Sequence, residues 1–471
     1  MKGNRVNTTR QRMDASPSLP DWDQVETQAA ELLAAYLRIN TTNPPGQEAA
    51  AAAFLADVFA QHGIAAQVAE AAPGRANLLA ILPAADPGAR AAPILLTHHM
   101  DVVTADPAEW SLDPFGGLER DGCLYGRGAL DTKGLGIMHL LAMLLLQASG
   151  RPRQRSVLYL AVADEEVNSV HGMVWALNHW REELAGAIAW GEGGMGLRGV
   201  LGPAPFFGIA TAEKLSLTLR LRAHGLSGHG SSPHRQNANE ILAQAIVRLV
   251  AWQPPLEITP VTAEMMQQAG PLLGGWRGWL LRQPALRLPA SLYGALLASQ
   301  PLFATMLRDT VSVTIVRGGD KDNVIPGLAE ATLDVRLLPG REPDAFIARL
   351  EEVVQDPRVQ VAVLDAPIAA PASPIRNPLY AALSRVIQRH VPDAQVCPIQ
   401  LTGCTDGRWL RRQGLPTYGL APIIVDEADL AGIHGPDERI SRANLRLGVR
   451  IVFETLRALC CAVDAAEENV A

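Results

Sequence analysis

Histidine and acidic residues stand at the ends of apolar segments in this chain, an arrangement that suits a metal site. His99 and Asp101 end the apolar run that begins at Leu95. Side chains two residues apart in an extended chain point to the same side, so Asp101 can fix the tautomer of a metal-binding His99. An apolar run of this length indicates a buried strand of a parallel sheet. Ligands of open α/β sheets bind beyond the carboxyl ends of such strands.

Other segments of the chain end in the same kinds of side chain. A lone carboxylate is usually a solvated surface charge, but several apolar strands that each end in a metal-binding side chain are hard to obtain by chance. We therefore interpret them as one metal site. The further residues of this kind are Asp131, Glu165, Glu166, Glu192 and His434.

The elements that must position these side chains alternate between strand and helix up to about residue 210. This alternation predicts an α/β fold with a mostly parallel sheet covered by helices on both faces. The predicted helices are Trp22–Ile39, Glu48–Gln61, Gly134–Ala148 and His171–His179, and the predicted strands are Asn77–Ile81, Ile94–Thr97, Val157–Ala163 and Gly186–Trp190.

The pattern changes near Thr211 to half-exposed strands and amphipathic helices. Their βαββαβ order predicts an inserted α+β domain of ferredoxin-like fold over residues 211–368, with a helical insertion over 254–306. Residues 21–210 and 369–471 then form the catalytic domain, and residues 1–20 are expected to be disordered. The elements of the insert are strand Lys214–Arg222, helix Asn237–Ala251, strands Thr310–Arg317 and Glu330–Leu338, helix Pro343–Val354 and strand Val359–Leu364. Those that follow it are helix Pro378–His390, the turn Thr402–Arg408 and helix Arg442–Val463.

Length and composition exclude several classes of protein. A chain of 471 residues is too long for one core, and its net charge of -7 argues against binding to nucleic acid or to an anionic membrane. The five cysteines form no Cys-x-x-Cys pair, which favours a reducing cytoplasm over a disulfide framework. The polar N-terminus predicts no signal peptide, and the most apolar helix is too short to span a bilayer.

Taken in order, these segments resemble the family-20 zinc metallopeptidases. This group contains aminoacylase, carboxypeptidase S, glutamate carboxypeptidase, acetylornithine deacetylase and succinyl-diaminopimelate desuccinylase. The resemblance runs from about residue 25 to 460. The segments that carry it are His99–Val103, Trp110–Phe115, Gly126–Gly134, Asp164–Glu166, Gly191–Gly194, Gly228–Ser231, Asn323–Pro326, Ile433–Gly435 and Asp437–Ile440.

The resemblance implies a dinuclear zinc site. Asp131 would bridge two zinc ions, one held also by His99 and Glu192 and the other by Glu166 and His434. Asp101 would orient His99, and Glu165 would be the general base that takes a proton from the attacking water. Zinc lowers the pKa of a bound water to about 7, so a nucleophile is available at neutral pH. The same ligands accept cobalt or manganese.

Further residues match family positions that contact the substrate. His229 would reach the active site of a partner subunit and help bind the oxyanion, which implies a homodimer through the inserted domain; from spacing alone it is a turn histidine. Asn323, Arg336 and Arg408 would contact the amide or carboxylate of the substrate, and an arginine fork suits a carboxylate. Cys404 stands where the family usually has glycine, which puts the contacts of the Thr402–Arg408 turn in doubt.

The resemblance implies hydrolysis of an amide bond next to an amino acid with a free carboxylate, in an N-acyl amino acid or a peptide. The apolar segment 254–306 resembles the lid of the carboxypeptidase S and N-acyl-amino-acid hydrolase branch, which favours a hydrophobic acyl group or side chain. Deacylation of small metabolites such as acetylornithine or succinyl-diaminopimelate is the alternative.

Three classes of protein compete with this interpretation. Gly191–Gly196 matches the G-x-G-x-x-G pattern of dinucleotide-binding proteins, but glycines and prolines follow it in place of the required helix. A serine hydrolase would need a Gly-x-Ser-x-Gly elbow, which the sequence lacks. A non-catalytic zinc-binding relative would have lost a ligand or the base, whereas all five ligands and Glu165 are present.

Overall fold

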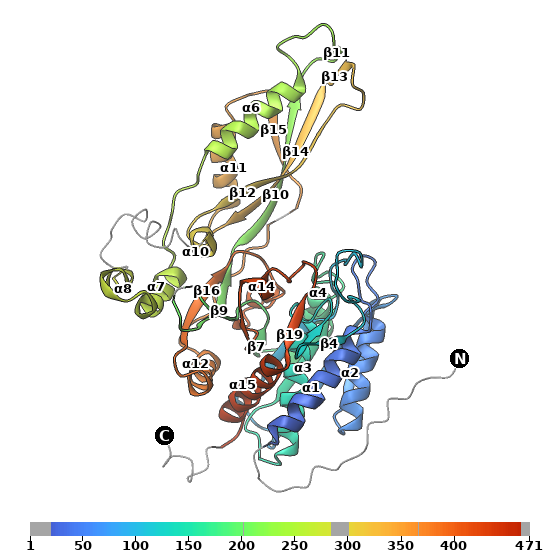
Figure 1. The fold of residues 1–471 in the computed structure, drawn as a ribbon, viewed down its shortest axis with the longest axis vertical. Helices are drawn as coiled ribbons and strands as arrows, with labels where there is room; N and C mark the ends of the chain where they lie inside the picture. The colour runs from blue at the N-terminus through green and yellow to red at the C-terminus, as the bar shows by residue number, and fades with distance from the viewer. Residues whose placement is uncertain (1–19, 201, 284–300, 366, 463–471) are drawn as a thin grey trace. The chain divides into compact units, whose positions relative to one another are not determined.

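The computed structural model describes residues 20–200, 202–283, 301–365 and 367–462. The predicted disordered segment 1–20 lies outside these ranges except for its last residue. The chain divides into two compact units, Met1–Val167 with Ala431–Ala471 and Asn168–Leu430. Each unit combines helices with β-sheet, which confirms the predicted α/β class (Figure 1). The insert at 211–368 falls inside the second unit, and its bounds as a domain stay a prediction.

The first unit contains the two strands at whose ends the sequence predicts His99 and Glu165. They belong to a group of strands of order β1-β2-β6-β3. The pair β3 and β6 is parallel, with His99 opposite Val162, and the other two pairs are antiparallel. Every residue of β3 and β6 is buried, which explains why both read as continuous apolar runs. The bounds are β1 (Ala66–Ala72), β2 (Arg75–Leu82), β3 (Ile94–His99) and β6 (Val157–Val162). A smaller sheet has the order β19-β5-β4 (Arg439–Ser441, Cys123–Tyr125, Leu118–Arg120).

The helices of the first unit cover this sheet. Helix α3 is buried along almost its whole length and packs against α1, α15 and β3, while α2 packs against β1 and β2. The ammonium of Lys133, which opens α3, donates to the carbonyl oxygen of Ile39 at 2.7 Å. Burial lowers the pKa of Lys133 to about 7. The bounds are α1 (Trp22–Leu37), α2 (Ala49–Gln61), α3 (Lys133–Ala148) and α15 (Arg442–Cys460).

In the second unit a group of strands follows the order β7-β17-β9-β8-β18, with β16 also paired to β9. The pairs β7–β17, β9–β16 and β8–β18 are parallel, and β9 is antiparallel to β8 and β17. Only β7 was predicted. The bounds are β7 (Ile188–Gly191), β8 (Gly196–Leu197), β9 (Phe206–Glu213), β16 (Gln395–Leu401), β17 (Thr417–Gly419) and β18 (Ile424–Val425). The accompanying helices are α4 (Met173–His179), α5 (Arg181–Leu184), α12 (Pro378–His390), α13 (Gly407–Arg412) and α14 (Glu427–Leu430).

The second unit also holds a four-stranded antiparallel sheet of order β12-β14-β10-β15. Helices α6 and α11 pack together over it (Figure 1). The leucines at alternate positions of β10 belong to the core of this sheet and its helices. With the chain order β10-α6-β12-β14-α11-β15, this is the predicted ferredoxin-like arrangement. The bounds are β10 (Leu215–His224), α6 (Ala238–Ala251), β12 (Thr310–Gly318), β14 (Leu328–Leu337), α11 (Pro343–Val354) and β15 (Val359–Val363).

Two smaller features accompany this sheet. The strands β11 (Gly228–His229) and β13 (Val324–Ile325) form an antiparallel ribbon. The predicted helical insertion 254–306 contains α7 (Pro260–Leu273), α8 (Gly275–Leu281) and α10 (Pro301–Met306), and its residues 284–300 lie outside the described part of the chain. Among the described residues, no helix has both the length and the apolar character needed to cross a membrane.

Candidate metal centre

Four of the predicted metal ligands come together in the first unit. His99 ends β3, and Asp131 lies two residues before the start of α3. Glu166 follows β6, and His434 lies in the loop before β19. The carboxylate of Asp131 lies between the two imidazoles, with Oδ1 2.9 Å from Nε2 of His99 and Oδ2 3.1 Å from Nε2 of His434. Oε2 of Glu166 is 3.4 Å from the same His434 nitrogen. The ligand atoms of Asp131, Glu166 and His434 all lie within 4.8 Å of one another.

The hydrogen bonding of this cluster fits a bound cation. Nδ1 of His99 lies 2.9 Å from the backbone oxygen of Asp101, so a proton on Nδ1 leaves Nε2 as a lone pair that faces the Asp131 carboxylate. Oε1 of Glu166 is buried and has no hydrogen-bond partner in the described structure. A buried acceptor without a donor is costly. Imidazole nitrogen and carboxylate oxygen are ligands that Zn²⁺ takes in proteins, so the residues present fit a divalent metal.

The electrostatics of the cluster agree with a cation site. Hydrogen bonds to Asp131 and Glu166 raise the pKa of His434 to about 10, although burial opposes the shift. Burial also works to raise the pKa of Asp131, but His434 and His99 outweigh it and hold that pKa well below its usual range. Without a metal, the anionic pair therefore keeps a proton on His434. A metal ion that binds Nε2 must displace this proton.

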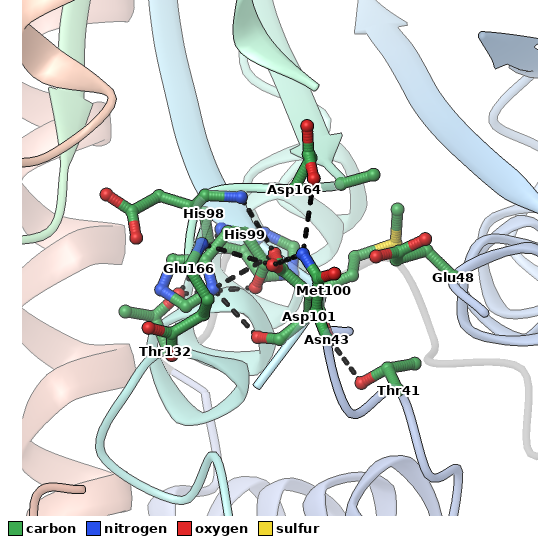
Figure 2. Close-up of polar contacts among 12 residues, drawn as sticks. Thr41, Asn43, Glu48, His98, His99, Met100, Asp101, Thr132, Asp164 and Glu166 are labelled. Atoms are coloured by element: carbon green, nitrogen blue, oxygen red, sulfur yellow. Dashed lines mark hydrogen bonds and ion pairs between the residues drawn. The ribbon is translucent and has the colours of Figure 1, made fainter. Parts of the chain in front are cut away.

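Asp101 holds two parts of the centre at once, as Figure 2 shows. Its side chain is fully buried. The carboxylate accepts the backbone N–H groups of Glu165 and Glu166, each at 3.1 Å, and the amide of Asn43 at 2.8 Å. Burial works to raise the pKa of Asp101, but the nearby His99 imidazole, the Asn43 amide and the backbone N–H groups outweigh that effect and lower the pKa.

The contact between Asp101 and His99 differs in detail from the sequence interpretation. The backbone oxygen of Asp101 makes the 2.9 Å contact with Nδ1 of His99, whereas its carboxylate Oδ1 lies 3.6 Å away. The backbone oxygen thus orients the imidazole ring. The carboxylate mainly fixes the turn that carries Glu165 and Glu166.

Glu438 is a residue of the centre for which the sequence predicts no role. It is fully buried. Its carboxylate accepts the backbone N–H groups of Gly128, Leu130 and Asp131 at 3.0, 2.7 and 3.0 Å, and a guanidinium N–H of Arg127 at 2.7 Å. Glu438 therefore fixes the loop that presents Asp131. The sequence signal was the segment Asp437–Ile440, which carries part of the resemblance but which spacing alone does not connect to Asp131.

Glu165, the predicted base, and Glu192, a predicted metal ligand, both follow strand ends. Glu165 follows β6, half-buried, with its backbone N–H bonded to Asp101. Glu192, also half-buried, directly follows β7 in the second unit.

The structure brings His229 and Asn323 together on the β11–β13 ribbon. His229 pairs with Val324, and the backbone N–H of Gly230 donates to the backbone oxygen of Asn323 at 2.8 Å. Both side chains are exposed. Nδ1 of His229 accepts the backbone N–H of Ser231 at 3.2 Å and lies 2.8 Å from its hydroxyl. The ribbon thus brings together two residues that are 94 positions apart in the sequence.

Arg336 lies next to the predicted glycine-rich turn. On β14 its guanidinium makes two hydrogen bonds to Asp334, at 2.8 and 3.2 Å, and lies 3.6 Å from the sulfur of Cys404. Arg408 stands in the first turn of α13. Cys404 therefore contacts Arg336, a predicted substrate-binding residue. The smaller glycine that the family usually has at this position could not make that contact.

The comparisons with known proteins agree with this architecture. The model of peptidase family M20/M25/M40 matches residues 95–458. The chain is 32% identical over 373 residues to human N-fatty-acyl-amino acid synthase/hydrolase PM20D1, a match that covers 78% of this chain and 74% of the relative. It is 28% identical over 444 residues to aminoacylase-1 of Sus scrofa, which covers 92% and 96%.

Solved structures share the fold. The M20 family metallo-carboxypeptidase Sso-CP2 from Sulfolobus solfataricus matches with a TM-score of 0.68 and 19% identity, over 92% of this chain and 99% of the other. Human carnosine dipeptidase 1 matches with a TM-score of 0.66 and 17% identity, over 93% and 97%. The resemblance inferred from the sequence is thus confirmed. The chain belongs to peptidase family M20/M25/M40 and is a metal-dependent amidohydrolase.

Proposed function

We propose that this chain binds two zinc ions that share Asp131. His99 and Glu192 would complete the ligands of the first ion, and Glu166 and His434 those of the second. The observation that carries the proposal is the position of the Asp131 carboxylate between the imidazoles of His99 and His434. When bound, the ions polarise the scissile carbonyl and lower the pKa of a water molecule to about 7.

The residues of the chain itself would move the proton and hold the reacting groups. Glu165 would take the proton of the attacking water and pass it to the leaving nitrogen. Its backbone N–H is fixed by the buried carboxylate of Asp101, which supports a defined position for this base. Oε2 of the adjacent Glu166 lies 3.4 Å from Nε2 of His434, which supports a ligand role for Glu166 that is separate from the role of Glu165.

The proposed substrate is an N-acyl amino acid, or a peptide, with a free carboxylate. The similarity to N-fatty-acyl-amino acid synthase/hydrolase PM20D1 and to aminoacylase-1 supports this class. Arg336 and Arg408 would contact the carboxylate, and His229 and Asn323 the amide. A hydrophobic acyl group is favoured by the apolar insertion 254–306, where the side chains of Trp276 and Trp279 on α8 are 66% and 60% exposed.

A substrate panel tests this function. Purified protein loaded with zinc would be given N-acetyl, N-octanoyl and N-oleoyl derivatives of leucine and phenylalanine, together with acetylornithine and dipeptides. We expect kcat/KM to rise with the length of the acyl chain and to fall when the free carboxylate is replaced by an amide. A clear preference for acetylornithine would favour deacylation of small metabolites. Zinc binding with no turnover of any compound would favour the non-catalytic alternative.

We also propose a cytoplasmic homodimer. The exposed position of His229 supports a role toward a partner subunit, and none of the five cysteines, all of them among the described residues, forms a disulfide, as expected in a reducing compartment. Light scattering coupled to gel filtration measures the oligomeric state, and fractionation of the source cells measures the cellular location. A monomer that is fully active would exclude a role for the His229 of a partner subunit.

A further inference from the structure

A buried network of polar side chains lies beside the turn that carries Glu165 and Glu166, and it comes from a part of the chain to which no role has been given. Its residues are Asn43, Glu48 and Arg75, which precede the family match at 95–458. Figure 2 shows Asn43 and Glu48 near Asp101 and Asp164. All of these side chains are at least nine-tenths buried.

Asp164 is the residue on which the network acts. Its backbone φ is 69°, a left-handed conformation that is unfavourable for a residue other than glycine. Its carboxylate Oδ1 accepts a guanidinium N–H of Arg75 at 2.9 Å and the amide N–H of Asn43 at 3.2 Å. Contacts to the side chain thus hold the backbone of Asp164 at the start of the turn.

Arg75 is itself held in place. Its Nε and Nη2 donate to the two carboxylate oxygens of Glu48 at 2.7 and 3.0 Å, and its Nη1 donates to the backbone oxygen of Pro45 at 3.2 Å. Gly46 makes this approach possible, because a Cβ at that residue would lie 2.3 Å from the guanidinium carbon. The planar fork of arginine bridges Glu48 and Asp164, which the single ammonium of lysine cannot reproduce.

Asn43 connects this network to Asp101. Its amide nitrogen donates to Asp101 at 2.8 Å as well as to Asp164. The chain around Asn43 is tied to the strand end by backbone hydrogen bonds with Val102, at 2.9 Å for the N–H of Asn43. Two carboxylates therefore fix the turn. Asp101 accepts the backbone N–H groups of Glu165 and Glu166, and the side chain of Asp164 is held by Asn43 and Arg75.

We propose that Arg75 and Asn43 are positioning residues that fix the turn Asp164–Glu166 and thereby aim Glu165 at the reacting water. The catalytic part of this inference rests on the proposed function, because it assumes that Glu165 is the base. Displacement of a reacting group by about 1 Å lowers the rate by about a hundredfold. Loosening the turn should therefore lower kcat with little change in KM.

The test compares three variants with the wild type. Arg75→Lys keeps the charge but removes the fork, and Asn43→Ala removes the bridging amide without stranding a charge. Arg442→Lys is the matched control, since Arg442 also bridges two carboxylates, Glu26 and Glu119, at 3.1 Å each. Two quantities are measured in each protein: hydrogen–deuterium exchange of the Glu165 and Glu166 amides without metal, and kcat, KM and zinc content with metal.

We expect faster exchange of both amides in Arg75→Lys and in Asn43→Ala. The value of kcat should fall about 10- to 100-fold in Arg75→Lys and about tenfold in Asn43→Ala. In both variants KM and zinc content should stay within about twofold of the wild-type values. Arg442→Lys should match the wild type. Unchanged exchange in both variants, or an equal loss of kcat in the control, overturns the proposal. If the wild type hydrolyses no acyl amino acid, the proposed function fails, but the exchange rates still decide whether the network fixes the turn.

Discussion

The metal centre of the first unit and the β11–β13 ribbon of the second unit hold their functional residues in opposite ways. His99 and Asp131 are tied by hydrogen bonds to buried neighbours, and even the loop before Asp131 is fixed by Glu438. His229 and Asn323 are exposed and depend on a short ribbon. A metal site needs ligands held in advance by a supporting shell of hydrogen bonds, whereas substrate contacts must be reachable. Changes to the metal ligands of the first region should therefore affect metal binding, whereas changes to the ribbon should affect only turnover.

The largest effect is expected at the shared ligand. Asp131→Asn should lower kcat/KM by about ten-thousandfold, because loss of the metal removes several kcal/mol of stabilisation from the transition state. Zinc content measured by atomic emission should fall in parallel. Asp57→Asn makes the same change at an exposed position on α2 and should have no effect. Full zinc content in Asp131→Asn would exclude a bridging role.

A second change separates the base from the ligands. Glu165→Gln should lower kcat by about a thousandfold, since general base catalysis contributes 10²–10⁴-fold, while zinc content stays at the wild-type value. Glu182→Gln, at an exposed position, is the control. If Glu165→Gln loses zinc as well as activity, Glu165 is a metal ligand instead of the base.

The hydrogen bonds that hold the Asp131 loop can be weakened without changing a metal ligand. Glu438→Gln removes the charge that accepts the N–H groups of Gly128, Leu130 and Asp131, and one amide N–H₂ group would then face these donors. Zinc affinity should fall about 10- to 100-fold, as for other residues that orient metal ligands. Competition with a chelator measures this. An unchanged affinity would mean that the Asp131 loop holds its shape without Glu438.

The pH dependence of zinc binding follows from His434. Its pKa of about 10 in the metal-free chain means that the imidazole carries a proton at pH 7, so binding releases about one proton per chain from this residue. Apparent affinity should thus rise with pH up to about 10, by about tenfold per unit for this group. Calorimetry in buffers of different ionisation enthalpy measures the released protons. His434→Ala should release about one proton fewer; no difference would contradict this assignment.

The smallest effects are expected in the ribbon. His229→Ala and Asn323→Ala should leave zinc content and thermal stability unchanged, since exposed substitutions usually alter stability by less than about 0.5 kcal/mol. Their kcat/KM should fall about tenfold, the loss of one hydrogen bond to a polar substrate group. His224→Ala, an exposed histidine on β10, is the control. Lower zinc content in the ribbon variants would remove the contrast between the two regions.

The sequence predicted the parts of this molecule that depend on local pattern. The buried runs of β3 and β6 and the acidic residues after them were recognised because a fully buried strand leaves an uninterrupted apolar segment. The ferredoxin-like insert was recognised because its strands alternate along the chain. Strand β16 was missed, since Pro398 within it argues against a central strand; it pairs with β9, which itself was hidden by Gly208 and the surrounding loops.

The supporting residues of the centre lay beyond sequence reasoning. Arg75 and Asp164 are 89 positions apart, and Glu438 is 307 positions from Asp131. Nothing in spacing or periodicity brings such pairs together, because their contact depends on how the strands and loops pack. The ligands were recognised by resemblance, whereas the hydrogen bonds that hold them required the structure.

Diffraction from crystals grown with zinc, measured at the zinc absorption edge, tests the central claim most directly. We expect two anomalous peaks per chain, both in contact with Asp131, with His434 and Glu166 beside one of them and His99 beside the other. Zinc bound away from Asp131 in a chain that hydrolyses acyl amino acids would contradict the account.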